Sequence, residues 1–231
     1  MSATGTDDPG PIGAVLSPRS LREELEASGA QPNNRLSALS RSMLDPAVRR
    51  WVETIINRMA IERFDVVLDL GGGDMVLKHL AAELDLLAML EEAGIDVTLL
   101  HLAGPEVESL GYLASVEAQG PHGAPLFAPA RTAVILNEGL VAEDLDPAEV
   151  FQPIRAHAVF RAALARGAEV VPMPRLKVAY EVNRHHLSFA AAAAGAAADG
   201  LPPMTPTDRQ RVKLWLRAMD AAFAGIAGWL P

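Results

Sequence analysis

Short apolar segments alternate with longer segments of helical periodicity between residues 64 and 194, and this alternation constrains the fold more than any other feature. The expected strands are 66–70, 97–102, 132–136 and 168–171. Helical segments at about 75–93, 106–117, 147–166 and 177–194 follow them. Continuous apolar strands that alternate with helices are typical of a parallel sheet buried on both faces. The sequence therefore predicts an α/β fold with a doubly wound, mostly parallel sheet flanked by helices.

The segments outside this alternation define the expected domain organisation. Residues 1–17 are polar and rich in glycine and proline, and we expect them to be disordered. An α/β nucleotide-binding-like domain is expected over 18–199, with extra helices at about 18–26 and 45–59. After the Gly/Pro-rich break at 200–206, residues 206–231 are predicted to form a C-terminal amphipathic helix. Its apolar stripe of Trp215, Met219, Phe223 and Ile226 is expected to pack on the domain.

Composition excludes several classes of function. The chain has no cysteine, which rules out disulfides, thiolate metal sites and a cysteine nucleophile. Its 20 Lys and Arg against 29 Asp and Glu give a net charge of −9, so bulk charge gives no strong nucleic-acid signal. No apolar stretch is long enough to cross a membrane, and no basic, apolar leader opens the sequence. We therefore expect a soluble, cytoplasmic protein.

An acid followed by a run of glycines is the strongest candidate for a ligand site. The segment VVLDLGGGD places Asp69 at the end of an apolar strand and Gly71, Gly72 and Gly73 in the following turn. In parallel α/β sheets ligands bind beyond the carboxyl ends of the strands, and glycines let the backbone approach a phosphate. One interpretation is therefore that Asp69 contacts Mg²⁺ or its water, as the Walker B aspartate does in P-loop proteins.

Two other interpretations of this segment stay open. VLDLGGG is similar to the glycine loop of S-adenosylmethionine-dependent methyltransferases, with Glu106 as the candidate ribose ligand. Met75, however, replaces the last expected glycine, and the next strand ends in Leu-His-Leu. Alternatively, the glycines form a turn capped by Asp74 and bind nothing, and the chain is a non-catalytic adaptor. A similarity to the DLGGG loop of actin-like ATPases is excluded, because 231 residues cannot supply their two duplicated subdomains.

Four segments carry a family resemblance when they are taken in order. They are FDVVLDLGGGD (64–74), VTLLHLAGPEVESLGYL (97–113), AVILNEG (133–139) and EVVPMPRLKVAYEV (169–182). They resemble the Walker B strand, the next strand and helix, the adenine-reading strand and the last strand of the ParA/MinD-type partition ATPases. This family is a branch of the P-loop NTPases with a deviant Walker motif. The similar segments span about half of the chain.

The resemblance implies a site for ATP and Mg²⁺ and assigns roles to individual residues. Asp69 corresponds to the Walker B aspartate, as catalytic residue and metal ligand, and Gly71, Gly72 and Gly73 follow it. Asn137 corresponds to the asparagine that reads the base, and Pro172 to the proline beside the base. The resemblance also implies a homodimer, or a partner protein in plasmid partition or conjugation.

The sequence departs from this family at the phosphate loop. The motif KGGxGK[ST] does not occur, and the three lysines, Lys78, Lys177 and Lys213, do not lie where its lysine would fall. The chain is therefore expected to be a shortened copy, the product of a misassigned start codon, or a relative that has lost hydrolysis. Without that lysine much of the phosphate charge is unmatched, so we expect weak Mg-ATP binding or none, and doubtful hydrolysis.

Overall fold

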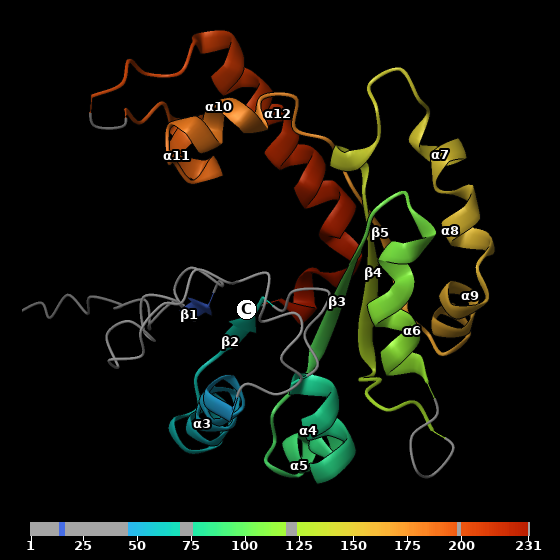
Figure 1. Ribbon diagram of the computed structural model, residues 1–231. Helices are drawn as coiled ribbons and strands as arrows, with labels where there is room; N and C mark the ends of the chain where they lie inside the picture. Colours follow the sequence, from blue (N-terminus) through green and yellow to red (C-terminus); the bar gives the residue numbers. More distant parts are fainter. Residues whose placement is uncertain (1–13, 17–45, 70–75, 119–123, 198–199, 231) are drawn as a thin grey trace, which may run out of the picture. The chain divides into compact units, whose positions relative to one another are not determined.

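The structure is a computed structural model, and it describes residues 14–16, 46–69, 76–118, 124–197 and 200–230. The chain divides into two compact units, Met1–Val97 together with Pro231, and Thr98–Leu230. The class of the fold is α/β with a parallel sheet flanked by helices, as predicted (Figure 1). The expected helix at 18–26 lies outside the described residues.

Where the structure describes it, the first unit combines a short parallel strand pair with three helices. Strand β1 (Ala14–Leu16) pairs in parallel with β2 (Val66–Leu68), so β1 lies within the segment expected to be disordered. Helix α3 (Pro46–Glu62) confirms the helix expected at 45–59. It buries Val52, Ile55 and Ile56, which recur at helical spacing.

The long helix expected at 75–93 is two helices, α4 (Val76–Leu84) and α5 (Leu86–Glu92). Asp85 separates them with φ 47° and ψ 53°, in the left-handed region. Aspartate enters this region more readily than most residues, and a left-handed residue cannot continue a right-handed helix. Leu80 and Leu90, two of the residues with helical spacing in the sequence, are buried, whereas Leu84 at the end of α4 is 42% exposed and Leu86 is buried in its place.

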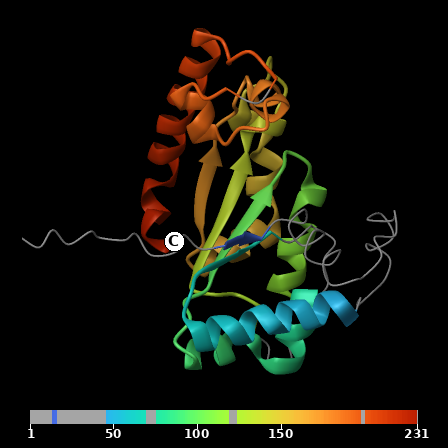
Figure 2. The same cartoon turned by 90° about the vertical axis from the view of Figure 1, so that its left-hand side faces the viewer.

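The second unit contains a three-stranded parallel sheet in the order β3-β4-β5. The strands are β3 (Thr98–Ala103), β4 (Arg131–Asn137) and β5 (Glu169–Met173). All three point the same way, as the arrows show (Figure 2). Residues 133–136 of β4 are all buried, as expected for a strand covered on both faces.

The connections between the strands cover one face of this sheet. Strand β3 leads through the 3-10 turn η1 (Val107–Leu110) and α6 (Gly111–Glu117) to β4. After β4 come η2 (Glu138–Leu140), α7 (Pro147–Val150), α8 (Gln152–Ala156) and α9 (Ala158–Ala165). Right-handed crossovers between successive neighbouring strands place their helices on the same face, and Figure 1 shows α6, α8 and α9 there. The single helix expected at 147–166 is thus three short helices.

The C-terminal segment covers the other face. Helix α12 (Pro206–Phe223) contacts β5 and continues into the turn η3 (Ala224–Trp229). Ile226 of η3 is buried in one cluster with Ala133, Ile135 and Val171. Thr205 caps α12, since its Oγ1 accepts from the Asp208 backbone N–H at 3.2 Å, and Pro206 occupies the first turn.

Two short helices form a smaller cluster with α12. They are α10 (Ala179–Arg184) and α11 (Phe189–Ala194), which replace the single helix expected at 177–194. His186 (φ 50°) breaks the helix, and Ser188 caps the next one by accepting from the Ala191 N–H at 3.1 Å. Their apolar side chains pack with those of α12 in a cluster of Val178, Val182, Ala192, Ala193, Met204 and Val212.

In the described part of the chain, no helix has the length and apolar character needed to cross a membrane.

Candidate functional site

The carboxyl edge of the β3-β4-β5 sheet brings three exit loops together. Because the strands are parallel, their carboxyl ends meet at one edge. Ala103 pairs with Leu136 across β3 and β4, and Asn137 pairs with Met173 across β4 and β5. The loops that begin at Gly104, Glu138 and Pro174 therefore lie side by side. This edge is where ligands bind in open parallel sheets.

Asn137 ends β4 and presents hydrogen-bond donors at this edge. Its Oδ1 accepts from the backbone N–H of Gly139 at 3.0 Å, which caps η2. A backbone N–H can only donate, so the carboxamide oxygen must face Gly139 and the NH₂ group points away from it. Within the described residues the NH₂ group makes no hydrogen bond. A side chain at position 139 would meet this oxygen, since a Cβ there would lie 2.9 Å from it.

Arg175 lies on the exit loop of β5 and is held by the exit loop of β4. Its Nε donates to the backbone carbonyl of Glu138 at 3.3 Å, and its side chain is partly buried. Other arginines of this unit pair with carboxylates: Arg166 with Glu117, Arg184 with Glu181 and Arg211 with Asp208. Arg175 has no carboxylate partner among the described residues. A partly buried guanidinium without a counter-ion is uncommon, because burial penalises the unpaired charge.

Trp215 fixes the exit loop of β5 from α12. Its indole Nε1 donates to the carbonyl oxygen of Pro174 at 2.7 Å. Its ring also contacts the ring of Phe189 on α11, with centroids 4.7 Å apart and planes inclined by 55°. One side chain thus connects α11, α12 and the residue before Arg175.

The exit loop of β3 is closed by its own hydrogen bonds. Nε2 of the buried His101 donates to the Ser109 carbonyl at 3.2 Å, and Ser109 Oγ donates to the Gly104 carbonyl at 3.1 Å. Burial lowers the pKa of His101, and the hydrogen bond to Ser109 raises it by less. The imidazole is therefore held neutral, stacked near the ring of Tyr112. The exposed Leu140 lies over Gly104, with its Cδ1 3.2 Å from where a Cβ would stand.

Pro172 is exposed on β5, one residue before the partner of Asn137. Proline has no N–H, so within a sheet it is confined to positions whose amide faces away from the ladder. This fits the place of β5 at the end of the strand order β3-β4-β5. Pro172 pairs with Leu136, so two of the predicted site residues, Asn137 and Pro172, lie one register position apart on adjacent strands.

Asp69 and Lys78 belong to the first unit, whereas Glu106 belongs to the second. Asp69 directly follows β2 and is exposed, whereas Gly71, Gly72 and Gly73 lie outside the described residues. Lys78 lies in the first turn of α4, and the alternative ribose ligand Glu106 is exposed before η1. Across the described residues, no three His, Asp or Glu side chains are gathered as a metal site. A single carboxylate is nevertheless compatible with Mg²⁺, which takes its other ligands from water and phosphates.

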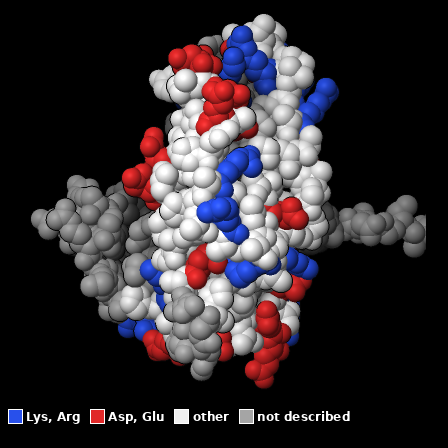
Figure 3. Space-filling model, turned by 90° about the vertical axis from the view of Figure 1, so that its right-hand side faces the viewer, with Lys and Arg blue, Asp and Glu red and all other residues white. Residues whose placement is uncertain are grey.

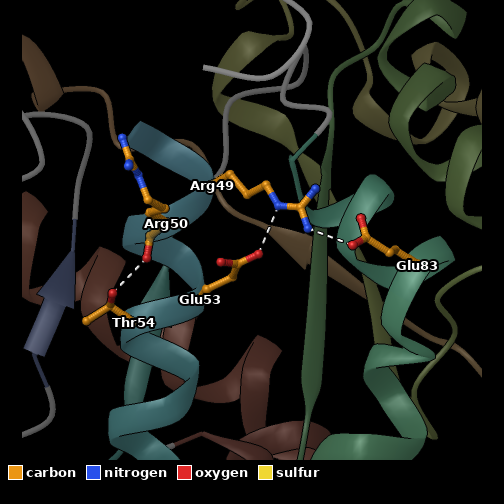
Figure 4. A network of polar contacts seen from close by, with 5 residues as sticks. All are labelled: Arg49, Arg50, Glu53, Thr54 and Glu83. Carbon is orange, nitrogen blue, oxygen red and sulfur yellow. Dashed lines mark hydrogen bonds and ion pairs between the residues drawn. The ribbon is translucent and has the colours of Figure 1, made fainter. Parts of the chain in front are cut away.

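An ion-pair network connects α3, which precedes β2, with α4, which follows Asp69 in the chain (Figure 4). Arg49 of α3 lies between two carboxylates: its Nε contacts Glu53 at 2.8 Å and its Nη2 contacts Glu83 of α4 at 2.9 Å. Hydrogen bonds to Glu83 and Glu53 raise the pKa of Arg49, and the bond from Arg49 lowers the pKa of Glu83. The network fixes α4 against α3, and so sets where the chain resumes after the glycine segment.

The helical side of the second unit carries charges of both signs. Figure 3 views the side on which α7, α8 and α9 lie and shows basic and acidic side chains interspersed. Arg155 and Arg161 are exposed there, as is Glu149. Such mixing is typical of a solvated helix surface rather than of a phosphate-binding stripe.

Comparison of the chain with protein-family models, curated proteins and solved structures gave no match. The site therefore rests on its own geometry. Sequence reasoning did not identify Arg175 as a site residue. It placed Trp215 in an apolar stripe and did not predict its hydrogen bond to Pro174. Arg175 follows a proline at a strand end, which is the only signal the sequence offered.

Proposed function

We propose that the chain is a ParA/MinD-like nucleotide-binding switch protein, with a P-loop NTPase-like sheet, that acts in the cytoplasm. The observation that carries this proposal is the pairing of Asn137 with Met173 beside Pro172 at one carboxyl edge. An amide donor next to an exposed proline suits an adenine base, which offers ring-nitrogen acceptors at its edge and an apolar face.

Asn137 would donate from its NH₂ group to an acceptor of the base. Its oxygen is already engaged by the Gly139 N–H, so the side chain is held in one orientation before a ligand arrives. Such preorganisation lowers the entropy lost on binding. Pro172 would flank the base with its ring.

Asp69, together with the glycines that follow it, would serve the phosphate end of the nucleotide. Asp69 would hold Mg²⁺ directly or through a water, and the ion would neutralise phosphate charge when bound. No lysine of the phosphate-loop type occurs in the sequence. Affinity for Mg-ATP is therefore expected to be low and hydrolysis inefficient, as in a switch that binds without turning over.

The partner expected for such a switch is a second copy of the chain or a protein of plasmid partition or conjugation. Leu140 and Leu145 follow β4 and are 63% and 51% exposed. Exposed leucines beside a ligand edge offer apolar contacts that a bound nucleotide could expose or cover.

Thermal unfolding with added ligands tests the proposal. Mg-ATP at millimolar concentration is expected to raise the Tm of the full chain, whereas S-adenosylhomocysteine is expected to leave it unchanged. A shift with S-adenosylhomocysteine alone would instead support a methyltransferase. No shift with either ligand would contradict nucleotide binding and favour a non-catalytic adaptor.

A further inference from the structure

We propose that Arg175 and Asn137 form a binding site for a phosphate group at the carboxyl edge of β4 and β5. The site shares Asn137 with the proposed function but goes beyond it, since phosphate binding here requires neither Asp69 nor an adenine base. It rests on how these two side chains are already hydrogen-bonded.

Each of the two side chains makes one hydrogen bond to the protein, and the polar atoms that remain for a ligand are all donors. The acceptor of Asn137, Oδ1, receives the Gly139 N–H at 3.0 Å. The guanidinium of Arg175 gives its Nε hydrogen to the Glu138 carbonyl at 3.3 Å. The nitrogens that remain are Nδ2 of Asn137 and both Nη atoms of Arg175, and all three donate. A ligand that meets this edge must therefore offer several acceptors.

The two side chains are positioned by one peptide segment. Asn137 directly precedes Glu138, whose carbonyl holds Arg175, and Asn137 also pairs with Met173 two residues before Arg175. The bond through Nε orients the guanidinium plane and leaves its two Nη groups as a fork. Such a fork matches two oxygens of one oxyanion.

Arg175 supplies a positive charge at the ends of β4 and β5. Arg175 is partly buried and lacks a carboxylate partner in the described parts of the chain, whereas Arg166, Arg184 and Arg211 each have one. A bound oxyanion would supply the missing counter-charge. Three donor nitrogens match the three free oxygens of a phosphate better than the two oxygens of a carboxylate.

Nuclear magnetic resonance of the full chain provides the test, with inorganic phosphate as the probe. The reporters are the indole N–H signal of Trp215, which is bonded to the residue before Arg175, and the amide signal of Gly139. The chain has three tryptophans, so the indole signals of Trp51 and Trp229 serve as internal references. Phosphate is expected to shift both reporters saturably, and sodium chloride of equal ionic strength is not.

Three variants locate the site. Arg175→Gln is expected to weaken phosphate binding about tenfold or more, and Arg175→Lys by less, because lysine keeps the charge without the fork. Asn137→Asp keeps the oxygen that caps Gly139 but replaces the NH₂ donors with negative charge, so it should also abolish the saturable shift. The control Arg155→Gln removes an exposed arginine of α8 and should titrate like the native chain.

Two results would overturn the proposal: shifts of equal size with chloride, or an Arg175→Gln variant that titrates like the native chain. If Arg175→Gln does not fold, Arg175→Lys and Asn137→Asp decide. The test is independent of nucleotide binding, because the phosphate titration contains no nucleotide. A saturable phosphate shift would support this site even if Mg-ATP did not raise the Tm.

Discussion

The indole nitrogen of Trp215 donates to the carbonyl oxygen of Pro174 across 2.7 Å, which joins α12 to the loop that follows β5. Trp215 is 41 residues beyond Pro174 in the chain. Pro174 has no N–H and so cannot donate to a neighbouring strand, which ends the sheet pairing there. Its carbonyl oxygen accepts from the Trp215 indole instead. The position of Arg175, the next residue, therefore depends on α12.

Replacing Trp215 by phenylalanine should show how much this hydrogen bond contributes to the free energy of unfolding. Trp215→Phe keeps an aromatic ring near Phe189 but leaves the Pro174 carbonyl without its donor, so we expect a loss of about 1 kcal/mol in the free energy of unfolding. Trp229→Phe is the matched control, because the indole of Trp229 makes no hydrogen bond within the described residues. The backbone oxygen of Trp229 accepts from Thr98 Oγ1, and the substitution leaves that oxygen in place. Urea denaturation of both variants measures the difference. Equal losses would show that the indole hydrogen bond contributes nothing.

Gly195 should not tolerate a side chain. It ends α11 with φ 86°, and a Cβ there would collide with the guanidinium of Arg209. We expect Gly195→Ala to destabilise the chain by about 1–2 kcal/mol, mainly through the left-handed backbone. Gly111→Ala is the control, since Gly111 has φ −58° and open space around its Cα. A thermal scan in which both variants melt together would contradict this account of Gly195.

His101 should make stability depend on pH. Burial lowers its pKa in the folded chain below the ordinary value of 6.5. As the pH falls below 6.5, His101 is protonated in the unfolded chain but stays neutral in the folded chain. The free energy of unfolding therefore decreases. His101→Gln keeps a donor for the Ser109 carbonyl and does not titrate. It should therefore reduce the slope of the unfolding free energy between pH 7 and 5, by at most about 1.4 kcal/mol per pH unit.

The control for this pH series is Gln210→Asn, which changes an exposed side chain of α12 and removes no titratable group. Its slope should equal that of the native chain. A His101→Gln variant with an unchanged slope would contradict the buried, neutral imidazole.

The Arg49–Glu83 pair should stabilise α4 in a salt-dependent manner. Removing the charge of Glu83 leaves Arg49 bonded to Glu53 alone, so Glu83→Gln should lower the Tm at low salt. At 1 M salt the difference from the native chain should largely disappear, since the pair is partly exposed and therefore screened. Glu92→Gln, at an exposed site at the end of α5, is the control. A Glu83→Gln effect that is the same at both salt concentrations would rule out an electrostatic origin.

Three strands of the expected sheet were predictable because they are continuous apolar runs, whereas the strand expected at 66–70 pairs with β1 in a separate two-stranded sheet. Strands β3, β4 and β5 each lie within two residues of the expected segments. The helix boundaries were less predictable, because Asp85 and His186 adopt left-handed backbones that interrupt the helices expected at 75–93 and 177–194. Short caps such as His157, whose Nδ1 accepts from the Val159 N–H at 3.3 Å, restart helices where the sequence pattern continues.

The candidate site was predictable only where it depends on strand ends. Asn137 and Pro172 were proposed because AVILNEG and EVVPMPRLKVAYEV resemble strands of the ParA/MinD-type ATPases, and both residues lie at or near the carboxyl end of a strand. The tethering of Arg175 by Glu138 could not, because it depends on a contact 37 residues away along the chain. Trp215 looked like one residue of an apolar stripe, and only the tertiary structure shows its hydrogen bond.

The measurement that tests nucleotide binding most directly is calorimetric titration of Mg-ATP into the native chain, Asn137→Asp and Asp69→Ala. Asn183→Asp, at an exposed asparagine of α10, is the control for the added charge. We predict that heat of binding is measurable for the native chain and for Asn183→Asp, and that it is lost in Asn137→Asp and weakened in Asp69→Ala. Equal heats from all four proteins would contradict the assignment of Asn137 and Asp69 to a nucleotide site.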